Sequence, residues 1–248
     1  MLSPVLYTLY TNDFIVTHKH VHLLKFADDS AIVGHLPHCG QDYFNIIESF
    51  YQWCKNNYLL LNVKKTKELI FDFRQSTKEP VCPLIINNEE VEVVTEIKYL
   101  GIMIDNRLNW EAHFNSIYKK ANQRMYFLRK LNAININKSI LKIFYTMAIQ
   151  SVLMYGVACW GGNMLQREKN KINVLIKKAS KICNFDLPHL DELYTAVCIN
   201  KATYILNDSE HPLKKEYQRS ARSLRLLTKK TKTERYFRSF VPSSSRML

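Results

Sequence analysis

The chain has 248 residues, of which 35 are Lys or Arg and 22 are Asp or Glu, so its formal net charge is +13. With 47% hydrophobic and 23% charged residues it can bury a core, which excludes a chain that is disordered throughout. Six Gly and seven Pro exclude a collagenous or low-complexity protein. The six cysteines form no C-x-x-C pair, which indicates buried thiols in a reducing compartment rather than disulfides or a zinc site.

The positive charge is concentrated in the second part of the chain. Residues 1–100 hold 9 basic and 12 acidic residues, whereas residues 101–248 hold 26 basic and 10 acidic residues. The stretch 214–246 alone carries 11 basic and 2 acidic residues. This asymmetry favours a polyanionic partner for the second part, and the alternative is a set of lysine-faced solvated helices with a basic tail. The amino terminus has no basic n-region, so we expect an intracellular protein, nuclear or cytoplasmic, and not a secreted one.

The first hundred residues predict a mixture of helices and strands. The predicted elements are, in chain order, a helix opening at Pro4, a hairpin with strands 21–26 and 31–34, a helix over 42–57, and strand-like alternation over 59–73 and 83–104 with a turn at Asn87-Asn88. The pattern therefore indicates an α+β domain over residues 1–105.

From about residue 106 the pattern is helical throughout. Over 109–132 one apolar stripe is formed by Trp110, Phe114, Ile117, Ala121, Met125 and Leu128. Three further helices are predicted at 137–160, 164–184 and 190–206, and His211-Pro212 breaks the pattern. We therefore expect a helical region over 106–210 and a flexible basic tail over 211–248.

One apolar stretch raises the question of a membrane. Residues 143–166 carry no charge and are long enough to span a bilayer. However, the stretch contains several polar residues and Gly161-Gly162, and positive residues flank it on both sides. A core helix followed by a Gly-Gly loop explains it with less strain, so no membrane is expected as a partner, and a transmembrane segment is the alternative.

The most informative segment is the hairpin over 24–33, in which Asp28 and Asp29 follow one another at the tip of an apolar sequence. Two adjacent carboxylates repel each other, and the local sequence offers them no obvious cationic partner. Such a pair suits divalent cations held ~4 Å apart, which activate a 3′-hydroxyl and stabilise a leaving pyrophosphate. The alternative is an ordinary Asp-Asp turn, because aspartate is favoured in turns for its backbone hydrogen bonds.

This hairpin resembles the F/Y-x-D-D box of reverse transcriptases, in the F-A-D-D form common in non-LTR (LINE-type) retrotransposons. Further segments resemble motifs of the same family in the same order. They are the end of the preceding palm motif at 2–13, a W…L-x-L-N-x-x-K-T…F motif at 53–71, a K-Y-L-G-x-x-I-D primer-grip hairpin at 98–105, a first thumb helix at 110–131 and a Y-G-x-x-x-W element at 155–160. The resemblance implies an α+β fold, with a partial polymerase palm of hairpin, helix and antiparallel strands followed by a helical, thumb-like bundle.

The resemblance also implies roles for individual residues. Asp28 and Asp29 would be catalytic carboxylates that bind Mg²⁺ or Mn²⁺, and Lys65 would protonate or steady the departing pyrophosphate unless it is simply a solvated lysine. The residues implied in primer and template binding are Phe26, Ala27, Tyr99, Leu100, Gly101, Lys119, Lys120 and Arg124. The implied partners are an RNA template and a DNA primer, held by contacts that depend on salt and little on sequence.

One catalytic motif of the family has no match in this chain. The family's palm takes a further aspartate from a segment of the type F-x-D-x-x-x-A-F-D, which these 248 residues do not contain. We therefore expect a fragment of an RNA-directed DNA polymerase, whose family chemistry is two-metal nucleotidyl transfer to a primer 3′-hydroxyl, that is inactive alone. The alternative is a non-catalytic, basic RNA- or DNA-binding remnant, and the sequence leaves open whether the chain is an enzyme.

A second constellation gives a remote alternative. His189, Asp191 and His211 resemble the H-x-D…H triad of iron(II) oxygenases, and the thumb-helix segment resembles a helical region of some eukaryotic AlkB-homologue proteins. The triad fits badly, because Asp191 falls where a helix begins and acidic residues are ordinary in a first turn. An oxygenase would also need strands around the triad, whereas this region is predicted to be helical.

Overall fold

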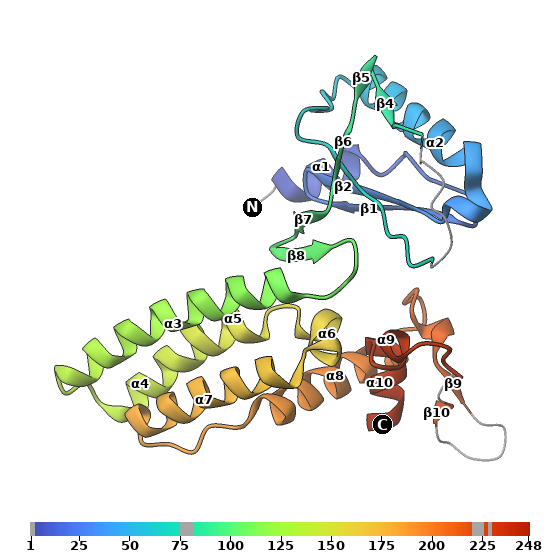
Figure 1. Ribbon diagram of the computed structural model, residues 1–248. Helices are drawn as coiled ribbons and strands as arrows, with labels where there is room; N and C mark the ends of the chain where they lie inside the picture. Colours follow the sequence, from blue (N-terminus) through green and yellow to red (C-terminus); the bar gives the residue numbers. More distant parts are fainter. Residues whose placement is uncertain (1–2, 75–81, 220–225, 228–229) are drawn as a thin grey trace. The chain divides into compact units, whose positions relative to one another are not determined.

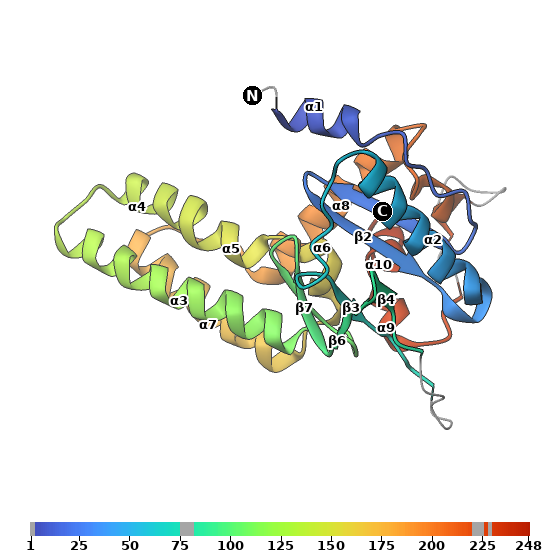
Figure 2. The same ribbon diagram turned by 90° about the horizontal axis from the view of Figure 1, so that it is seen from above.

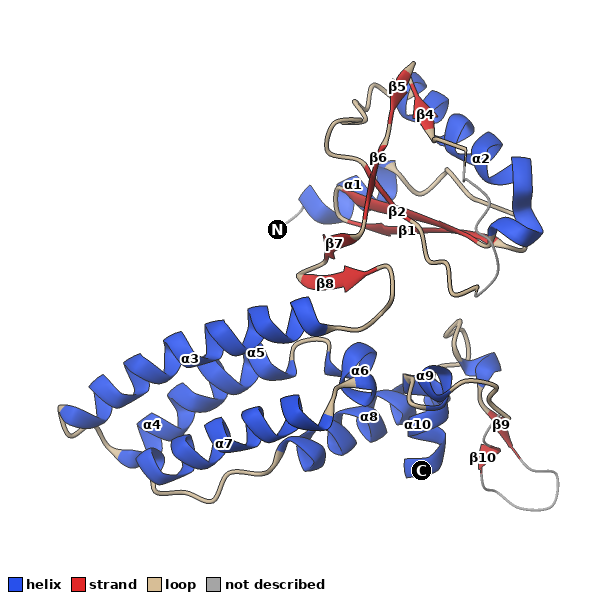
Figure 3. Ribbon diagram, viewed as in Figure 1, coloured by secondary structure: helices blue, strands red, loops and turns tan. Residues whose placement is uncertain are grey.

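The computed structural model describes residues 3–74, 82–219, 226–227 and 230–248 (Figure 1). The chain divides into two compact units, residues 1–97 and 98–248, which are described separately below. Strands are concentrated in the first unit and helices in the second, as Figure 3 shows.

The first unit combines two helices with short, paired strands. Its elements are α1 (Ser3–Tyr10), β1 (Val21–Phe26), β2 (Asp29–Gly34), α2 (Leu36–Asn56), β3 (Lys67–Leu69), β4 (Ile85–Ile86), β5 (Glu89–Glu90) and β6 (Glu92–Val94). β1 pairs with β2 in an antiparallel hairpin that closes at Phe26↔Asp29. β4 pairs antiparallel with β5 through Asn87 and Asn88, which both have positive φ, as asparagine tolerates in two-residue hairpin turns. The predicted first helix, hairpin and Asn-Asn turn are thus confirmed.

Three features of this unit differ from the prediction. β3 pairs with β6 in parallel, although only antiparallel strands were expected. The segment between α2 and β3 contains no strand, and the Thr66 hydroxyl closes a turn on the Asn62 carbonyl at 3.0 Å. The helix expected from residue 42 begins at Leu36 and bends at Gly40, where φ is +42°. A parallel pair requires a long connection between its strands, which alternation within each strand does not reveal.

The second unit is a bundle of helices entered through a β-hairpin. Its first elements are β7 (Glu96–Tyr99), which starts at the boundary and pairs with β8 (Ile102–Asp105), and then α3 (Glu111–Ala133), α4 (Lys138–Phe144), a π-helical turn (Tyr145–Gln150), α5 (Ser151–Met154), α6 (Val157–Trp160), a 3-10 turn (Gly161–Asn163), α7 (Gln166–Cys183) and α8 (Leu190–Asn207). Figures 1 and 2 both show α3 beside α5, and α7 packs against α3 as well. The helices predicted at 109–132, 164–184 and 190–206 are confirmed to within a few residues.

The core of the second unit is built from buried side chains of α3, of the helical segment that follows it, and of α6, α7 and α8. α3 buries the residues that the sequence pattern selected, namely Trp110 at its start and then Phe114, Ile117, Ala121, Met125 and Leu128. The following helical segment buries Leu141, Tyr145, Ile149, Leu153 and Val157. Side chains spaced four residues apart drift around an α-helix, because it has only 3.6 residues per turn. The π-helical turn has more residues per turn, so it keeps the side chains of this second stripe on one side of the helix.

The segment expected as one helix over 137–160 is interrupted at Tyr155-Gly156. Gly156 has φ +62°, which favours glycine, and α6 begins immediately after it. By length and composition alone, Lys138–Asn163 is able to cross a membrane. Only 28% of its most apolar window is buried, although one side of the segment packs into the core of this unit. The core-helix interpretation therefore stays a prediction, with a transmembrane segment as the alternative.

The carboxy-terminal segment differs from the expected flexible tail. Its described elements are a 3-10 turn (Lys214–Glu216), β9 (Gln218–Arg219), β10 (Leu226–Leu227), α9 (Glu234–Phe237) and α10 (Phe240–Met247), while residues 220–225 and 228–229 of the predicted tail lie outside the described residues. α10 packs against α8, and its buried Ser244 hydroxyl lies 2.7 Å from the Tyr217 hydroxyl. The small side chains of 243–245 let α10 lie close to α8, so a segment without large apolar clusters still docks.

The cysteines follow the prediction only in part. Among those described, Cys54, Cys183 and Cys198 are buried, whereas Cys82 and Cys159 are exposed, and all five are free thiols. Burial raises the pKa of the Cys54 and Cys183 thiols, which keeps them protonated.

Candidate metal-binding and nucleic-acid-binding residues

The carboxylate pair lies at the tip of the β1–β2 hairpin. Ala27 and Asp28 form the two-residue turn, and Asp29 is the first residue of β2. Ala27 has φ +50°, a left-handed conformation that such turns usually give to glycine and that costs a side-chain-bearing residue about 1 kcal/mol. Phe26, Ala27, Asp28 and Asp29 are all exposed, so a strained turn presents both carboxylates to solvent.

The cation nearest in sequence points away from this turn. The Lys25 ammonium donates hydrogen bonds to the carbonyl oxygens of Thr11 and Phe14, the latter at 3.2 Å, and lies over the Phe14 ring. Burial lowers the pKa of Lys25. Among the residues that the structure describes, no ion pair neutralises Asp28 or Asp29. The pair therefore keeps its negative charge available to a ligand.

The charge of Asp28 also affects Tyr7 of α1. Burial, and then the charge of Asp28, raises the pKa of the Tyr7 hydroxyl. Asp13, which follows α1, instead accepts a hydrogen bond from the Trp53 indole at 3.2 Å. Asp13 is thus engaged in a contact with α2 and is no third member of the carboxylate pair.

The donor set suits a hard divalent cation, although it is small. In the described part of the chain, no group of three or more His, Cys, Asp and Glu residues is placed to hold a metal. Proteins commonly bind Mg²⁺ through only one or two carboxylates, with water and substrate phosphates as the remaining ligands. Asp28 and Asp29, being acidic, exposed and free of an ion pair, fit that type of site.

Lys65 is exposed in the turn that precedes β3. Its backbone N–H donates to the carbonyl and side-chain oxygens of Asn62, both at 3.1 Å. No contact in the described structure joins the Lys65 ammonium to Asp28 or Asp29. Its role at the pyrophosphate therefore stays a prediction.

The segment that resembles a primer grip forms a tight turn. Leu100 and Gly101 connect β7 to β8 with φ +45° and +83°, and positive φ at both positions is the geometry that twisted two-residue hairpins favour. The Tyr155 hydroxyl donates to the Leu100 carbonyl at 2.8 Å. A Cβ on Gly101 would lie 3.2 Å from the Tyr155 ring, so the group that approaches this glycine is Tyr155.

Two buried aromatic residues, His113 and Trp160, support the same hairpin. The Met103 N–H donates to His113 Nδ1 at 3.3 Å, and the His113 ring meets the Trp160 ring edge-on, with 5.0 Å between centroids. The Trp160 indole in turn donates to the Tyr155 carbonyl at 3.0 Å. Burial, helped by the charge of Lys120, lowers the pKa of His113 to about 4, so the ring stays neutral as an Nδ1 acceptor requires. We call Tyr155, Trp160 and His113 the brace.

The brace was not predicted from the sequence. Its only signal was the Y-G-x-x-x-W resemblance, which marks Tyr155 and Trp160 without saying what they contact. Asp105, the last residue of the grip motif, was missed as well. Its carboxylate accepts hydrogen bonds from the backbone N–H groups of Asn109 and Trp110, each at 3.0 Å, and so fixes the loop that leads into α3.

The predicted nucleic-acid contacts on α3 differ in their surroundings. Lys119 and Lys120 are exposed, and neither has an acidic partner in the described structure. Arg124 is half-buried and donates to the Ala148 carbonyl of the π-helical turn. The two lysines are therefore free to meet phosphates, whereas Arg124 also holds α3 against the next helix.

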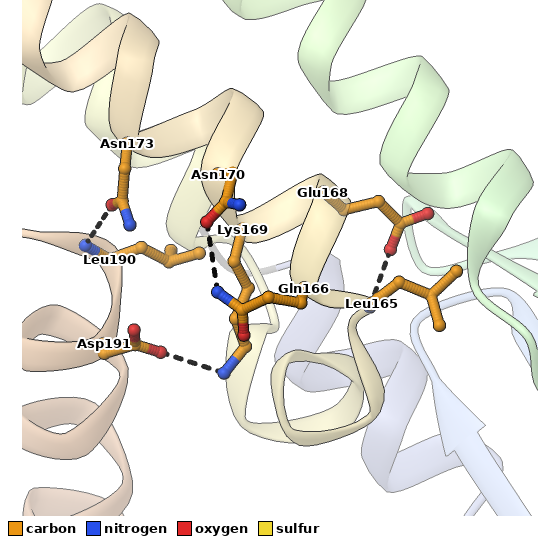
Figure 4. Close-up of polar contacts among 8 residues, drawn as sticks. All are labelled: Leu165, Gln166, Glu168, Lys169, Asn170, Asn173, Leu190 and Asp191. Atoms are coloured by element: carbon orange, nitrogen blue, oxygen red, sulfur yellow. Dashed lines mark hydrogen bonds and ion pairs between the residues drawn. The ribbon is translucent and has the colours of Figure 1, made fainter.

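The structure gives no support to an oxygenase triad. Asp191, at the start of α8, faces Lys169 of α7 (Figure 4), and its carboxylate oxygen lies 2.9 Å from the ammonium nitrogen. His211 Nδ1 accepts a hydrogen bond from the Leu213 N–H at 3.1 Å. His189, Asp191 and His211 do not form a metal-binding group in the described residues.

Three curated proteins of Drosophila melanogaster are similar to this chain. They are the "Probable RNA-directed DNA polymerase from transposon BS", 26% identical over 197 residues, the "Probable RNA-directed DNA polymerase from transposon X-element", 24% identical over 173 residues, and the "RNA-directed DNA polymerase from mobile element jockey", 26% identical over 201 residues. The similarity covers 73%, 65% and 72% of this chain and 21%, 18% and 20% of those proteins. The chain thus spans about a fifth of the length of these relatives.

The relatives confirm the resemblance to reverse transcriptases of non-LTR retrotransposons and indicate a reverse-transcriptase-like retrotransposon protein. The family described as "Alkylated DNA repair protein alkB homolog 8, N-terminal" also matches residues 110–151. That match covers α3, α4 and the π-helical turn and includes no residue of the supposed triad. No solved structure matches the chain.

Proposed function

We propose that the chain is the part of a non-LTR retrotransposon RNA-directed DNA polymerase that contains the end of the palm and the thumb. The names of the relatives support this assignment. The observation on the structure that carries it is the exposed Asp28–Asp29 pair at a hairpin tip, with no ion pair from the described residues. Residues 1–105 then correspond to palm and 106–210 to thumb, and the ligand is an RNA template paired with a DNA primer.

In this proposal each part of the chain has one task in nucleotidyl transfer. Asp28 and Asp29 hold Mg²⁺ or Mn²⁺, which when bound supplies the charge that activates a primer 3′-hydroxyl and stabilises the leaving pyrophosphate. Phe26 and Ala27 lie under the primer end, and Lys65 gives the pyrophosphate a proton or a compensating charge. Orientation of the reacting groups is itself a large part of such catalysis.

The second unit positions the nucleic acid. The turn at Tyr99, Leu100 and Gly101 contacts the primer backbone, and the brace keeps that turn in one conformation. Lys119 and Lys120 meet phosphates along the duplex, which gives a salt-dependent affinity with little sequence preference. Arg124 contributes by holding α3 in place.

We further propose that residues 1–248 do not extend a primer on their own. The family's two-metal chemistry uses a further aspartate from a segment of the type F-x-D-x-x-x-A-F-D, which these 248 residues do not contain. The purified chain, given an RNA template, a DNA primer, nucleotides and Mg²⁺ or Mn²⁺, is expected to yield no extended product. Any template-dependent extension would contradict this part of the proposal.

Metal binding tests the carboxylate pair directly. Electron paramagnetic resonance of free Mn²⁺, with a primer–template duplex present, compares wild type with Asp28→Asn/Asp29→Asn. The matched control is Glu89→Gln/Glu90→Gln, since Glu89 and Glu90 are also adjacent, exposed acids of a hairpin. We expect wild type and control to deplete the free Mn²⁺ signal and the aspartate variant to lose most of that depletion. Equal depletion by both variants would remove Asp28 and Asp29 from the proposed site.

A second candidate function is a non-catalytic RNA- or DNA-binding protein, which the positive charge of residues 101–248 favours. The two candidates differ at the hairpin and agree on the helical unit. If the chain binds the duplex and its Mn²⁺ uptake does not depend on Asp28, this second candidate is favoured.

A further inference from the structure

A groove with a volume of about 550 Å³ lies in the second unit between α3 and the helical segment that follows it. Its walls are almost wholly apolar and are formed by Phe127 and Leu131 of α3 and Ile134 directly after it, together with Phe144 and Ala148 on the opposite side. We call this feature the α3–α4 groove. The catalytic and primer-contacting residues proposed above leave it unexplained, apart from Arg124 at its margin.

The groove belongs to a larger apolar surface. Phe127 is 55% exposed and Ile134 is 69% exposed, although both are large hydrophobic residues. On the opposite side Ile140 of α4 is 55% exposed, and Met147 of the π-helical turn is 72% exposed. Contiguous exposed apolar surface of this kind usually marks an interaction site.

The charge around the groove has a single sign. Between Glu111 and Glu168 the chain contains no Asp or Glu, whereas it contains eight Lys and Arg residues. Both helical walls lie within this stretch, so no carboxylate of either wall opposes an acidic ligand. The apolar lining offers few donors for phosphates or base edges, which favours a ligand with an apolar face over a nucleic acid.

We propose that the α3–α4 groove binds an acidic amphipathic helix of a partner protein. The apolar side chains of that helix, repeated at i, i+3, i+4 and i+7, would fill the groove beside Phe127 and Ile134. Its acidic side chains would face Lys130 at the margin, an exposed residue whose ammonium lies over the Tyr126 ring. This inference does not depend on the polymerase assignment, because it uses no residue of the carboxylate hairpin or the grip turn.

A designed peptide provides the probe. A fluorescein-labelled helix of about 18 residues, with Leu and Phe on one face and Glu elsewhere, is titrated against the full chain by fluorescence anisotropy. A scrambled peptide of identical composition has the same charge without the apolar face. We expect the amphipathic peptide to bind at least about tenfold more tightly than the scrambled one. Equal binding would show general charge attraction and would overturn the proposal.

Two pairs of neighbouring variants locate the site. Phe127→Ser is expected to weaken binding about tenfold, and Ile134→Ser, on the same wall, provides an independent variant. Tyr126→Ser is the control, because Tyr126 is 51% exposed but does not line the groove. Since the Tyr126 ring contacts Lys130, we expect this variant to weaken binding, but by no more than about threefold. Lys130→Gln should weaken binding and Arg129→Gln should not. Circular dichroism confirms that each variant is folded.

Other ligands are outcomes of the same test. Vesicles containing anionic lipid and an RNA–DNA hybrid are each offered as competitors of the bound peptide and as direct ligands of the Phe127→Ser variant. If Phe127→Ser weakens the binding of either ligand as strongly as it weakens peptide binding, the groove is assigned to that ligand. This result would contradict a protein partner. Hybrid binding that is unchanged in Phe127→Ser, together with lost peptide binding, supports the proposal.

Discussion

In the first unit the turn between β1 and β2 is exposed, whereas in the second unit the turn between β7 and β8 is held by the Tyr155 side chain, and the hairpin that contains this turn is tied to α3 through His113. Both turns force non-glycine residues, Ala27 and Leu100, into positive φ. Only Leu100 is stabilised there by a side chain, the Tyr155 hydroxyl at 2.8 Å. The comparison indicates that the second unit builds its grip turn by its own folding, whereas the carboxylate turn is presented without such support.

The hydrophobic core of the second unit is also larger than that of the first unit. The main cluster of the first unit contains four buried hydrophobic residues, Ile47, Leu84, Ile86 and Val91. That of the second unit contains 23 buried residues drawn from the segment between Trp110 and Cys198. Because burial of apolar surface is the main favourable term in folding, the second unit should be much the more stable.

Hydrogen exchange provides the largest expected contrast. Amides of residues 21–34 belong to a two-stranded sheet with exposed Leu24 and Val33, and two strands alone are marginally stable. We expect them to open more easily than α3 and α7 by about 3 kcal/mol, a difference of roughly a hundredfold in protection. Mass-spectrometric exchange on the full chain measures this, and equal protection of both regions would contradict the comparison.

His113 makes the second unit sensitive to acid. Its pKa is about 4 in the folded chain and near 6.5 when unfolded, so unfolding takes up a proton between those pH values. The stability that this residue contributes is therefore complete above about pH 6.5 and is lost as the pH falls toward 4, by about 3 kcal/mol in total. Urea unfolding at pH 7 and pH 4.5 should show a smaller loss for His113→Phe than for wild type. His189→Phe, which changes an exposed histidine, should behave as wild type; an unchanged loss in His113→Phe would refute the assignment.

Tyr155→Phe removes one hydrogen bond of the brace and keeps the ring beside Gly101. Loss of such a bond costs about 1 kcal/mol, so the amides of Gly101 and Ile102 should exchange roughly fivefold faster. Tyr126→Phe, at another exposed tyrosine, should leave them unchanged. If the two variants exchange alike, the hydroxyl does not hold the turn.

Glu68, in the first unit, provides an effect of the same size as Tyr155→Phe. Its carboxyl is buried, has an oxygen without a partner among the described residues, and burial raises its pKa. A raised pKa stabilises the fold only below the unfolded value, so at pH 7 the carboxylate is a cost. Glu68→Gln should therefore raise stability at pH 7 by about 1 kcal/mol, whereas the exposed Glu89→Gln should not. Thermal unfolding compares them, and a lower midpoint for Glu68→Gln would show that the charge has an unseen partner.

What the sequence predicted well depends on local periodicity. The buried residues of α3 repeat at helical spacing, and the two strands of the β1–β2 hairpin are adjacent in the chain. The local sequence pattern therefore reveals both. The parallel pairing of β3 with β6 could not be read in this way, because the partners are far apart in sequence. Nor could the docking of α10, whose contact with α8 depends on small serines rather than on an apolar stripe.

The residues of the candidate site differ in the same way, because some are visible in one short segment and others depend on contacts between distant segments. Asp28 and Asp29 were found because two adjacent acids at a hairpin tip are visible in one short segment. The brace was missed because the hydrogen bond from Tyr155 to Leu100 joins residues 55 positions apart. Asp105 was taken as part of a motif, and only the structure shows that its carboxylate fixes the loop before α3.

The most direct test of the proposed nucleic-acid contact is a salt titration of RNA–DNA hybrid binding by the full chain. The compared variants are Lys119→Gln/Lys120→Gln in the second unit and Lys64→Gln/Lys65→Gln, an equally adjacent and exposed lysine pair, in the first. Each phosphate-contacting lysine contributes about one to the slope of log affinity against log salt concentration. The account predicts that the α3 variant lowers that slope by about two while the Lys64 and Lys65 variant keeps it. An unchanged slope in the α3 variant, or an equal loss in both, would contradict the assignment of duplex binding to the second unit.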